Sequence, residues 1–532
     1  MKVQPTHPAL KSTVYGAHTV HAHRLSRLPV RYRGAIDFKT HKPRTLSELG
    51  NHTVLFGTTG SGKSTALSLH LGSVLPPSSP QFSSNYRALI YDAKTDNLPF
   101  LGELGFSLEK HLVLTNPFDQ RSSAWNIAKD AANPADARAV AHLLLPERNR
   151  DENPFFRDSV RSLLAATING LNREHSEWTF RHLILVFEDS ELLEYVLFRT
   201  EGGAALFKRL LGDVDPKTKA NINATLQTFV DLYRLVAALW SKAKTSFNFS
   251  EWSDGGGGLL VIGDHPRYED DMRIVNNMLV RTAIANVMAR PGEVKHDLTW
   301  FYLDELKDAG QFPGFTSLLS KGRSKGARAV LAAQGPSSLA AAFGNRDEVE
   351  EVLNNCSEKC VMQLGSQEDA EWAERNFTSI RRVRSSASVS DDHRIKDSVT
   401  YREEKEAALD ARMFRTLRSA EDTDRGLEAF YQWAGAYYDR SFVPGDVVNR
   451  EFTAMRRGTG SSLPPFVARP PTEYELEPLQ VEDRIHLKLP VTPGSSSTVT
   501  ARSQDEASPV PASAPVSEAK VPTFRLPPFP RP

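Results

Sequence analysis

A glycine-rich run that ends in a lysine and a hydroxyl residue stands near the start of this 532-residue chain. It separates an apolar stretch, which ends at Phe56, from a helix-compatible stretch that begins at Ala66. In such a strand–loop–helix setting, the glycines let backbone N–H groups surround a polyphosphate, and the helix N-terminus adds partial positive charge. The lysine reaches the β- and γ-phosphates, and the next hydroxyl binds Mg²⁺. The sequence therefore predicts a nucleoside triphosphate site with Mg²⁺, formed by Gly57, Thr58, Thr59, Gly60, Ser61, Gly62, Lys63, Ser64 and Thr65.

Two adjacent carboxylates follow an apolar run that begins at Thr299. In a phosphate-loop site, the first acid at the end of such a strand holds Mg²⁺, usually through water, and the next acid polarises the attacking water. Surface turns often show the same pattern, so the prediction depends on the phosphate loop elsewhere in the chain. We therefore predict Asp304 and Ser64 as metal ligands and Glu305 as the residue that activates water.

A basic segment, Lys321–Arg328, precedes another apolar run that is followed by Gln334. A solvated turn has the same composition. However, the charge that develops in phosphoryl transfer is often stabilised by an arginine from a neighbouring subunit. A glutamine at the carboxyl end of a strand is suited to contact the γ-phosphate or to position the water.

From His52 onward, short apolar runs alternate with helical segments, which is typical of a largely parallel α/β sheet. Several of these runs are almost continuous in Val, Ile and Leu, as expected for strands buried on both faces. The predicted strands are His52–Phe56, Ala88–Tyr91, Leu112–Leu114, Leu259–Gly263, Trp300–Leu303, Ala329–Ala333 and Cys360–Leu364.

The strand signal fades between residues 151 and 252, where apolar residues recur near the helical period. We predict an all-α insertion in the α/β domain. The predicted organisation is a basic N-terminal arm (1–45), a nucleotide-binding domain in two parts (46–150 and 253–457), the all-α insertion (151–252) and a Pro/Ser-rich tail (458–532).

The two ends of the chain differ from the middle in composition. Residues 1–44 carry nine Lys or Arg and a single acid, Asp37, which fits a solvated arm or a contact with nucleic acid or anionic lipid. After Gly458 the chain is rich in Pro, Ser and Thr, so it cannot bury enough apolar surface to fold and is expected to be disordered. Docking of a partner on a polyproline II segment is the alternative there.

The composition of the whole chain limits its class. The formal net charge is zero, so nucleic acid would have to bind to local basic patches. Two cysteines are too few for a disulfide framework, which fits a reducing compartment. No secretory signal is visible, and no apolar run approaches the ~20 residues needed to span a bilayer.

Several motifs, taken in order, resemble those of type IV secretion coupling proteins, the conjugative DNA-pumping ATPases of the TraG/TraD/TrwB type. The more specific block runs from Asp304 to Gln334, and the resemblance covers about Thr45 to Asp446. The matching segments are Phe301-Tyr302-Leu303-Asp304-Glu305, Gly310-Gln311-Phe312-Pro313-Gly314, Gly322-Arg323, Ala332-Ala333-Gln334, Tyr91-Asp92-Ala93-Lys94, Asn116-Pro117-Phe118, Trp125-Asn126 and Phe247-Asn248-Phe249-Ser250.

This resemblance implies a RecA-like nucleotide-binding domain with an inserted all-α domain, assembled as a ring, expected to be a hexamer. Such rings use ATP and Mg²⁺ to move single-stranded DNA, with its bound relaxase, to a secretion channel. The resemblance implies that Lys63 and Ser64 bind phosphate and Mg²⁺, with Asp304 and Glu305 as the metal and catalytic acids. It also implies that Arg323 acts in the neighbouring subunit's site and that Gln334 senses the γ-phosphate.

Two departures from the family pattern affect these expectations. The family usually has an N-terminal membrane anchor, which is not seen here, so we expect a cytoplasmic or peripheral protein whose membrane contact is indirect. Ala93 replaces the usual proline of the second-strand motif, which costs little. Two alternatives stay open: a double-stranded DNA pump of the FtsK/HerA kind, and a nucleotide-gated substrate receptor that hydrolyses ATP slowly.

Overall fold

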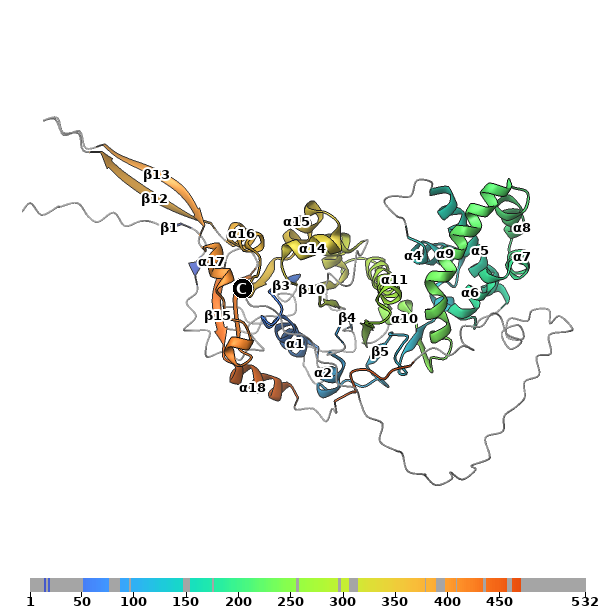
Figure 1. Cartoon of the computed structure of the whole chain (residues 1–532), viewed down its shortest axis with the longest axis horizontal. Helices are drawn as coiled ribbons and strands as arrows, with labels where there is room; N and C mark the ends of the chain where they lie inside the picture. Colours follow the sequence, from blue (N-terminus) through green and yellow to red (C-terminus); the bar gives the residue numbers. More distant parts are fainter. Residues whose placement is uncertain are drawn as a thin grey trace, which may run out of the picture.

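A ten-stranded, mainly parallel sheet forms the centre of the computed structural model (Figure 1). Its strands lie in the order β2-β15-β14-β11-β3-β10-β9-β4-β8-β5. All neighbours from β11 to β5 are parallel, whereas β14 is antiparallel to both β11 and β15. The strands are β2 (His18–Thr19), β3 (Thr53–Phe56), β4 (Arg87–Asp92), β5 (Leu112–Leu114), β8 (Gly258–Gly263), β9 (Thr299–Leu303), β10 (Ala327–Ala333), β11 (Glu358–Val361), β14 (Leu427–Trp433) and β15 (Tyr437–Val443).

The structure describes residues 14–15, 18–19, 51–75, 87–94, 97–146, 154–174, 177–254, 258–294, 298–305, 314–377, 379–388, 398–407, 409–433, 437–456 and 462–469. The predicted basic arm, apart from β1 and β2, and the Gly310–Pro313 motif lie outside these ranges.

The central strands are buried on both faces. In β9, Phe301 and Leu303 pack into one hydrophobic core, while Trp300 and Tyr302 pack into a second core on the other face. This alternation follows from the two-residue period of a strand. Because each face needs apolar cover, the strands read in the sequence as continuous hydrophobic runs.

Helices cover both faces of the sheet. Three helices pack into the smaller cores on one face: α1 (Lys63–Val74), α2 (Asn97–Glu103) and α18 (Gly445–Met455). The larger core on the other face takes side chains from α11 (Glu269–Met288), α13 (Phe315–Lys321), α14 (Pro336–Phe343), α15 (Arg346–Asn355), α16 (Gln367–Asn376) and α17 (Ala411–Arg415).

All seven predicted strands are present, which confirms a mainly parallel α/β sheet with helices on both faces. β11 ends at Val361, three residues earlier than predicted. The antiparallel strands β14 and β15 were not predicted, because polar residues such as Glu428 and Gln432 interrupt the apolar pattern of β14. Also unpredicted was the ribbon of β12 (Ser379–Ser388) and β13 (Ser398–Ala407), which projects from the sheet and pairs with β1 (Val14–Tyr15).

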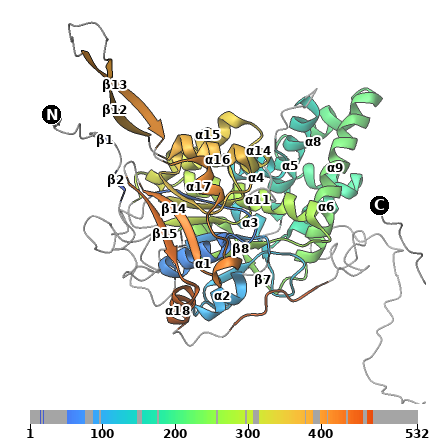
Figure 2. The same cartoon turned by 60° about the vertical axis from the view of Figure 1, so that its left-hand side comes forward.

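A group of helices, here called the helical insertion, forms a lobe beside the sheet (Figure 2). Hydrogen-bonding side chains start several of these helices: Asn133 caps α4, Asp189 caps α7 and Asp215 caps α9. The members are α4 (Pro134–Leu144), α5 (Pro154–Glu174), α6 (Phe180–Glu188), α7 (Ser190–Leu197), α8 (Gly203–Phe207) and α9 (Pro216–Trp240). No helix in the described ranges is both long enough and apolar enough to cross a membrane.

The chain enters and leaves the helical insertion side by side. Entry passes through β6 (Ser123–Trp125) and α3 (Ile127–Asp130), and return passes through β7 (Thr245–Phe247) and α10 (Phe249–Asp254). β6 and β7 pair in parallel, and the Asp130 carboxylate accepts hydrogen bonds from backbone N–H groups at the start of α10. These contacts fix the base of the insertion to the sheet domain.

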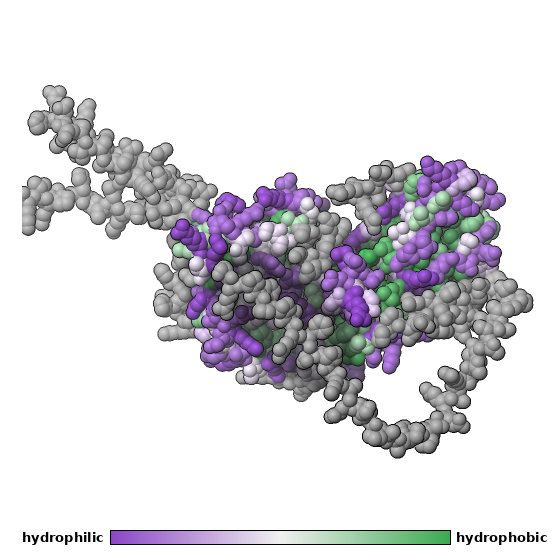
Figure 3. All heavy atoms as spheres, viewed as in Figure 1, coloured by the Kyte–Doolittle hydropathy of each residue, from purple (hydrophilic) through white to green (hydrophobic). Residues whose placement is uncertain are grey.

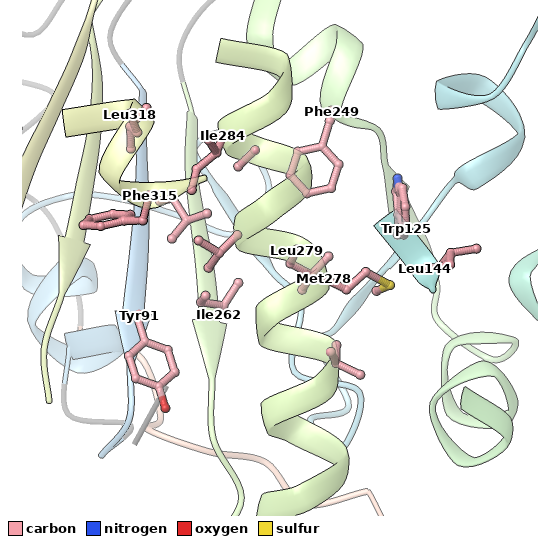
Figure 4. Close-up of a cluster of buried hydrophobic side chains, with 14 of the residues drawn as sticks. Tyr91, Trp125, Leu144, Phe249, Ile262, Met278, Leu279, Ile284, Phe315 and Leu318 are labelled. Atoms are coloured by element: carbon pink, nitrogen blue, oxygen red, sulfur yellow. The ribbon is translucent and has the colours of Figure 1, made fainter. Parts of the chain in front are cut away.

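Helix α11 links the sheet to the helical insertion through one continuous core (Figure 4). Ile284 lies on the side of Phe315 and the sheet, and Met278 lies on the side of Leu144 and Trp125. Hydrophilic residues cover much of the visible face of the insertion, with a group of hydrophobic residues near its junction with the sheet (Figure 3). The two parts of the fold therefore share buried apolar surface.

Residues 462–469, here called the C-terminal strap, bind the loop after β5. The Val467 N–H donates to Asp119 Oδ2 (3.0 Å), the Gln120 N–H donates to the Val467 carbonyl (2.9 Å), and the Arg469 N–H donates to the Phe118 carbonyl (2.8 Å). Within the segment expected to be disordered from residue 458, residues 462–469 are thus ordered, because Asp119 and the free backbone groups of the loop satisfy their polar atoms. Residues 470–532 lie outside the described ranges.

Candidate nucleotide-binding site

The glycine-rich loop connects β3 to α1 in the conformation that phosphate binding requires. Gly60 (φ 80°) and Gly62 (φ 101°) lie in the left-handed region, where other residues are strained. A Cβ built on Gly57 would lie 2.3 Å from Ser61 Oγ. The loop therefore closes tightly, and its backbone N–H groups can approach an anion.

Lys63 is the first residue of α1, and its side chain is folded back over the loop. Its Nζ donates to the carbonyls of Gly57 (2.7 Å) and Thr58 (3.0 Å). Burial lowers the pKa of Lys63, while the carboxylates of Glu305 and Asp304 act in the opposite direction. The Lys63 ammonium group and the N–H groups at the start of α1 form a positively charged site that fits a polyphosphate.

Ser64 and Asp304 come from two different loops, which follow the carboxyl ends of β3 and β9, and their side chains form a hydrogen bond. The Ser64 hydroxyl donates to Asp304 Oδ2 at 3.0 Å, and the Glu305 N–H donates to Asp304 Oδ1 at 3.0 Å. Parallel pairing of β3, β10 and β9 brings the carboxyl ends of these strands to one edge of the sheet, which is why the pair forms. A hydroxyl and a carboxylate are the hard oxygen donors that Mg²⁺ takes beside phosphate, so this pair fits the ion.

Glu305 is held in a strained backbone conformation, with a φ of 48°. Such a residue costs on the order of 1–3 kcal/mol, and it persists only where its surroundings determine it. Its Oε1 accepts a hydrogen bond from Gln334 Nε2 (3.1 Å), and its Oε2 lies 4.0 Å from Lys94 Nζ. The carboxylate is thus aimed into the site and contacts two groups suited to bind phosphate or water.

The two other predicted catalytic residues stand at opposite ends of β10. Gln334 follows the last residue of the strand and lies beside Glu305. Arg323 is exposed on the short helical turn Gly322–Lys325, which precedes the strand. Seven residues at about 3.3 Å each separate the two ends by ~20 Å. The structure therefore brings Gln334 to the phosphate loop of its own chain but not Arg323.

A cavity of about 750 Å³ lies over the phosphate loop. It is lined by the loop, by Lys94 and Glu305, by the turn at residues 420–425 and by Asn449 of α18. The Ala420 N–H donates to the Gly60 carbonyl at 3.0 Å, which joins the turn to the loop. Sequence reasoning assigned no site role to the residues that complete the cavity, Lys94, Ala420, Glu421, Asp424, Arg425 and Asn449. Lys94 stands in a motif of the family resemblance. The other five residues belong to no motif, and they reach the loop only because β14 and α18 return to it.

The family model for the type IV secretion-system coupling protein DNA-binding domain matches residues 43–411, more than half of the chain. The chain belongs to this family. The resemblance found in the sequence motifs is thereby confirmed. The coupling protein TraD of Escherichia coli strain K12 is 24% identical over 309 residues, which cover 54% of this chain and 42% of TraD. This chain therefore matches less than half of that relative's length.

Solved structures of the conjugative coupling protein TrwB share the fold. The unbound monoclinic form has a TM-score of 0.62 at 19% identity and covers 86% of this chain and 96% of that one. The complex with ADP and Mg²⁺ has a TM-score of 0.61 at 18% identity, covering 86% and 98%, and the complex with the non-hydrolysable ATP analogue ADPNP has 0.61 at 20%, covering 88% and 99%. These matches confirm the predicted RecA-like fold class, whereas the roles of individual site residues stay predictions.

Proposed function

We propose that this chain is an ATP-hydrolysing DNA translocase that acts as the coupling protein in conjugative transfer or type IV secretion. The observation that carries the proposal is the meeting of three features at one sheet edge: the phosphate loop, the Ser64–Asp304 pair and the Glu305–Gln334 pair. Family membership and the nucleotide complexes of TrwB support it.

In the proposed reaction, the loop N–H groups and Lys63 hold the phosphates of ATP. Ser64 and Asp304 would hold Mg²⁺, which would supply positive charge to the phosphates when bound. Glu305 orients the attacking water and takes up its proton, since its carboxylate is aimed into the site and its geometry is fixed by the backbone. Gln334, hydrogen-bonded to Glu305, contacts the γ-phosphate or the water and reports whether the γ-phosphate is present.

Arg323 is proposed to act on the nucleotide of a neighbouring subunit. It lies at the amino-end edge of the sheet, so its own phosphate loop is out of reach, and its exposure leaves it free to enter another subunit's site. A ring, most simply a hexamer, places the amino-end edge of one subunit against the nucleotide of the next. An arginine in that position stabilises the charge of the departing phosphoryl group.

The proposed cargo is single-stranded DNA with a bound relaxase, delivered to components of a type IV secretion channel. This rests on the family's description as a DNA-binding domain and on the conjugative relatives. The protein would then work in the cytoplasm at the inner face of the bacterial membrane, with its membrane contact made through channel partners. In this proposal, the two-part nucleotide-binding domain is the motor. The helical insertion is the part that faces the DNA.

The test is the steady-state ATPase rate without DNA, with single-stranded DNA and with double-stranded DNA. We expect strong stimulation by single-stranded DNA and none in the Lys63→Ala variant. Stimulation by double-stranded DNA alone would replace the proposal with a pump of the FtsK/HerA kind. A slow rate that neither polymer changes would replace it with a nucleotide-gated receptor.

A further inference from the structure

The turn that carries Arg323, here called the Arg323 turn (Gly322–Lys325), has a fixed backbone although the Arg323 side chain is exposed. The Arg323 carbonyl accepts a hydrogen bond from Nη1 of Arg328, a buried residue of β10, at 3.1 Å. The next carbonyl, that of Ser324, accepts from the Val294 N–H at 2.7 Å. Two segments of the chain therefore hold the backbone of the turn, while the guanidinium of Arg323 stays accessible to a partner.

Arg290 and Lys325 form a reciprocal pair of hydrogen bonds at the end of this turn. Arg290 follows the end of α11 and is buried. Its Nη1 donates to the Lys325 carbonyl at 3.3 Å, and Lys325 Nζ donates to the Arg290 carbonyl at 2.6 Å. Lys325 Nζ also donates to the Gly292 carbonyl at 3.2 Å. Each of the two side chains thus holds the backbone of the other residue, which joins the end of α11 to the Arg323 turn.

The same Arg290 guanidinium also reaches the base of the helical insertion. Its Nη2 donates to the Ser253 carbonyl at 3.1 Å, and its Nε donates to Ser253 Oγ at 3.4 Å. Ser253 belongs to α10, whose first N–H groups donate to Asp130 at the entry to the insertion. A guanidinium has five N–H donors in a fixed planar arrangement, so one arginine can bind two segments at once. Arg290 therefore bridges the Arg323 turn and the segment through which the chain returns from the insertion.

We propose that Arg290 is a positioning residue for Arg323. Its bridge sets where the Arg323 turn lies relative to the base of the helical insertion, and so where the Arg323 guanidinium enters the site of the neighbouring subunit. Placement matters because an error of about 1 Å in a reacting site can lower the rate about 10²-fold. This inference rests on the proposed function, since it takes Arg323 to act on the nucleotide of a neighbouring subunit.

The first test is a double-mutant cycle on the assembled full chain, measured as ATPase turnover and nucleotide Kd. Arg290→Ala should lower turnover about 10²-fold and leave the Kd for ATP unchanged, because it disturbs the Arg323 turn and not the phosphate loop. In an Arg323→Ala background the same substitution should cause no further loss, since two residues that act through one group are not additive. Arg273→Ala, an exposed arginine on α11, is the matched control and should keep its turnover.

Two milder variants keep the test decisive if Arg290→Ala loses its fold, which the thermal midpoint shows. Arg290→Lys keeps the positive charge but cannot reproduce the planar bridge, so it should lose most of the same turnover. Lys325→Ala removes only the two Nζ hydrogen bonds and should lower turnover about tenfold. Neither variant should lose turnover further when Arg323→Ala is already present.

A second test uses mixed assemblies of differently tagged subunits, in which the two sides of an interface come from different variants. Arg290→Ala and Lys63→Ala proteins should partly recover turnover when combined, because the first is defective on the arginine side and the second on the phosphate-loop side. Arg290→Ala and Arg323→Ala proteins should show no recovery, because both are defective on the same side. Recovery in this second pair would overturn the proposal.

The double-mutant cycle can also overturn the inference. Losses that multiply in the double variant would leave Arg290 with a structural role alone, and normal turnover of both Arg290→Lys and Lys325→Ala would show that the bridge does not position Arg323. Failure of the proposed function gives a different result: Arg323→Ala by itself would then keep the turnover of wild type.

Discussion

The two edges of the central sheet carry different parts of the proposed chemistry. At the carboxyl-end edge, Lys63, Asp304, Glu305 and Gln334 contact the phosphate loop or one another within a single chain. At the amino-end edge, Arg323 stands exposed, ~20 Å of strand away from that group. Under the proposed function, this difference means that one subunit would bind a nucleotide alone, whereas the complete catalytic set would require a second subunit.

The largest effect on turnover is expected from Arg323→Ala, which tests the role assigned to the amino-end edge. We expect turnover in the assembled protein to fall by about 10³, with ATP affinity unchanged, because a guanidinium that acts only on the transition state is lost. ATPase rate and nucleotide Kd are the measurements. Lys321→Ala, an exposed basic neighbour, is the control and should keep its rate.

Mixing experiments decide whether Arg323 works across subunits. Arg323→Ala and Lys63→Ala proteins, each nearly inactive alone, should partly recover activity when combined, since some interfaces then join an intact loop to an intact arginine. Mixed assembly is verified by differently tagged subunits. An isolated Arg323→Ala monomer whose basal rate drops as far as that of the assembled protein would place the arginine in its own subunit's site.

The next largest effect on turnover is expected from Glu305→Gln, at the carboxyl-end edge of the sheet. Glutamine keeps the shape but cannot take up the proton of water, so turnover should fall by about 10² while ATP still binds. The paired measurements are turnover and nucleotide Kd, compared with Lys63→Ala, which should lose binding itself. Near-normal turnover would show that another group activates the water.

A smaller effect is expected from Gln334→Ala, which removes the hydrogen bond to Glu305 and should slow turnover about tenfold. Because the two side chains touch, the double variant with Glu305→Gln should lose less than the product of the single losses. Strictly multiplicative losses would mean that the 3.1 Å contact has no part in catalysis.

The smallest effect on turnover is expected from the C-terminal strap, which binds the loop after β5, five places away from β3 in the sheet order. Truncation after residue 469 should leave the thermal midpoint unchanged, whereas truncation after residue 461 should lower it. The second cut leaves the buried Asp119 without the Val467 N–H and exposes loop groups, a loss of about 1–3 kcal/mol. Equal midpoints for the two truncated proteins would contradict the strap contacts.

Much of the fold could be predicted because its signals are local. Continuous apolar runs placed all seven parallel strands, and their buried faces explain that pattern. β14 and β15 were missed because antiparallel strands of mixed polarity have no such run. The strap was missed because its order depends on Asp119 and not on its own composition.

The sequence by itself determined the phosphate loop, since nine consecutive residues set both its backbone and its chemistry. It also indicated Asp304 and Glu305, because a parallel sheet brings the ends of its strands to one edge. Only the tertiary structure decided which distant residues complete the cavity: the turn at 420–425 and Asn449 reach the loop because β14, β15 and α18 fold back over α1. Backbone geometry within a loop is encoded by neighbouring residues, whereas a wall built from segments far apart in the chain depends on the packing of the whole domain.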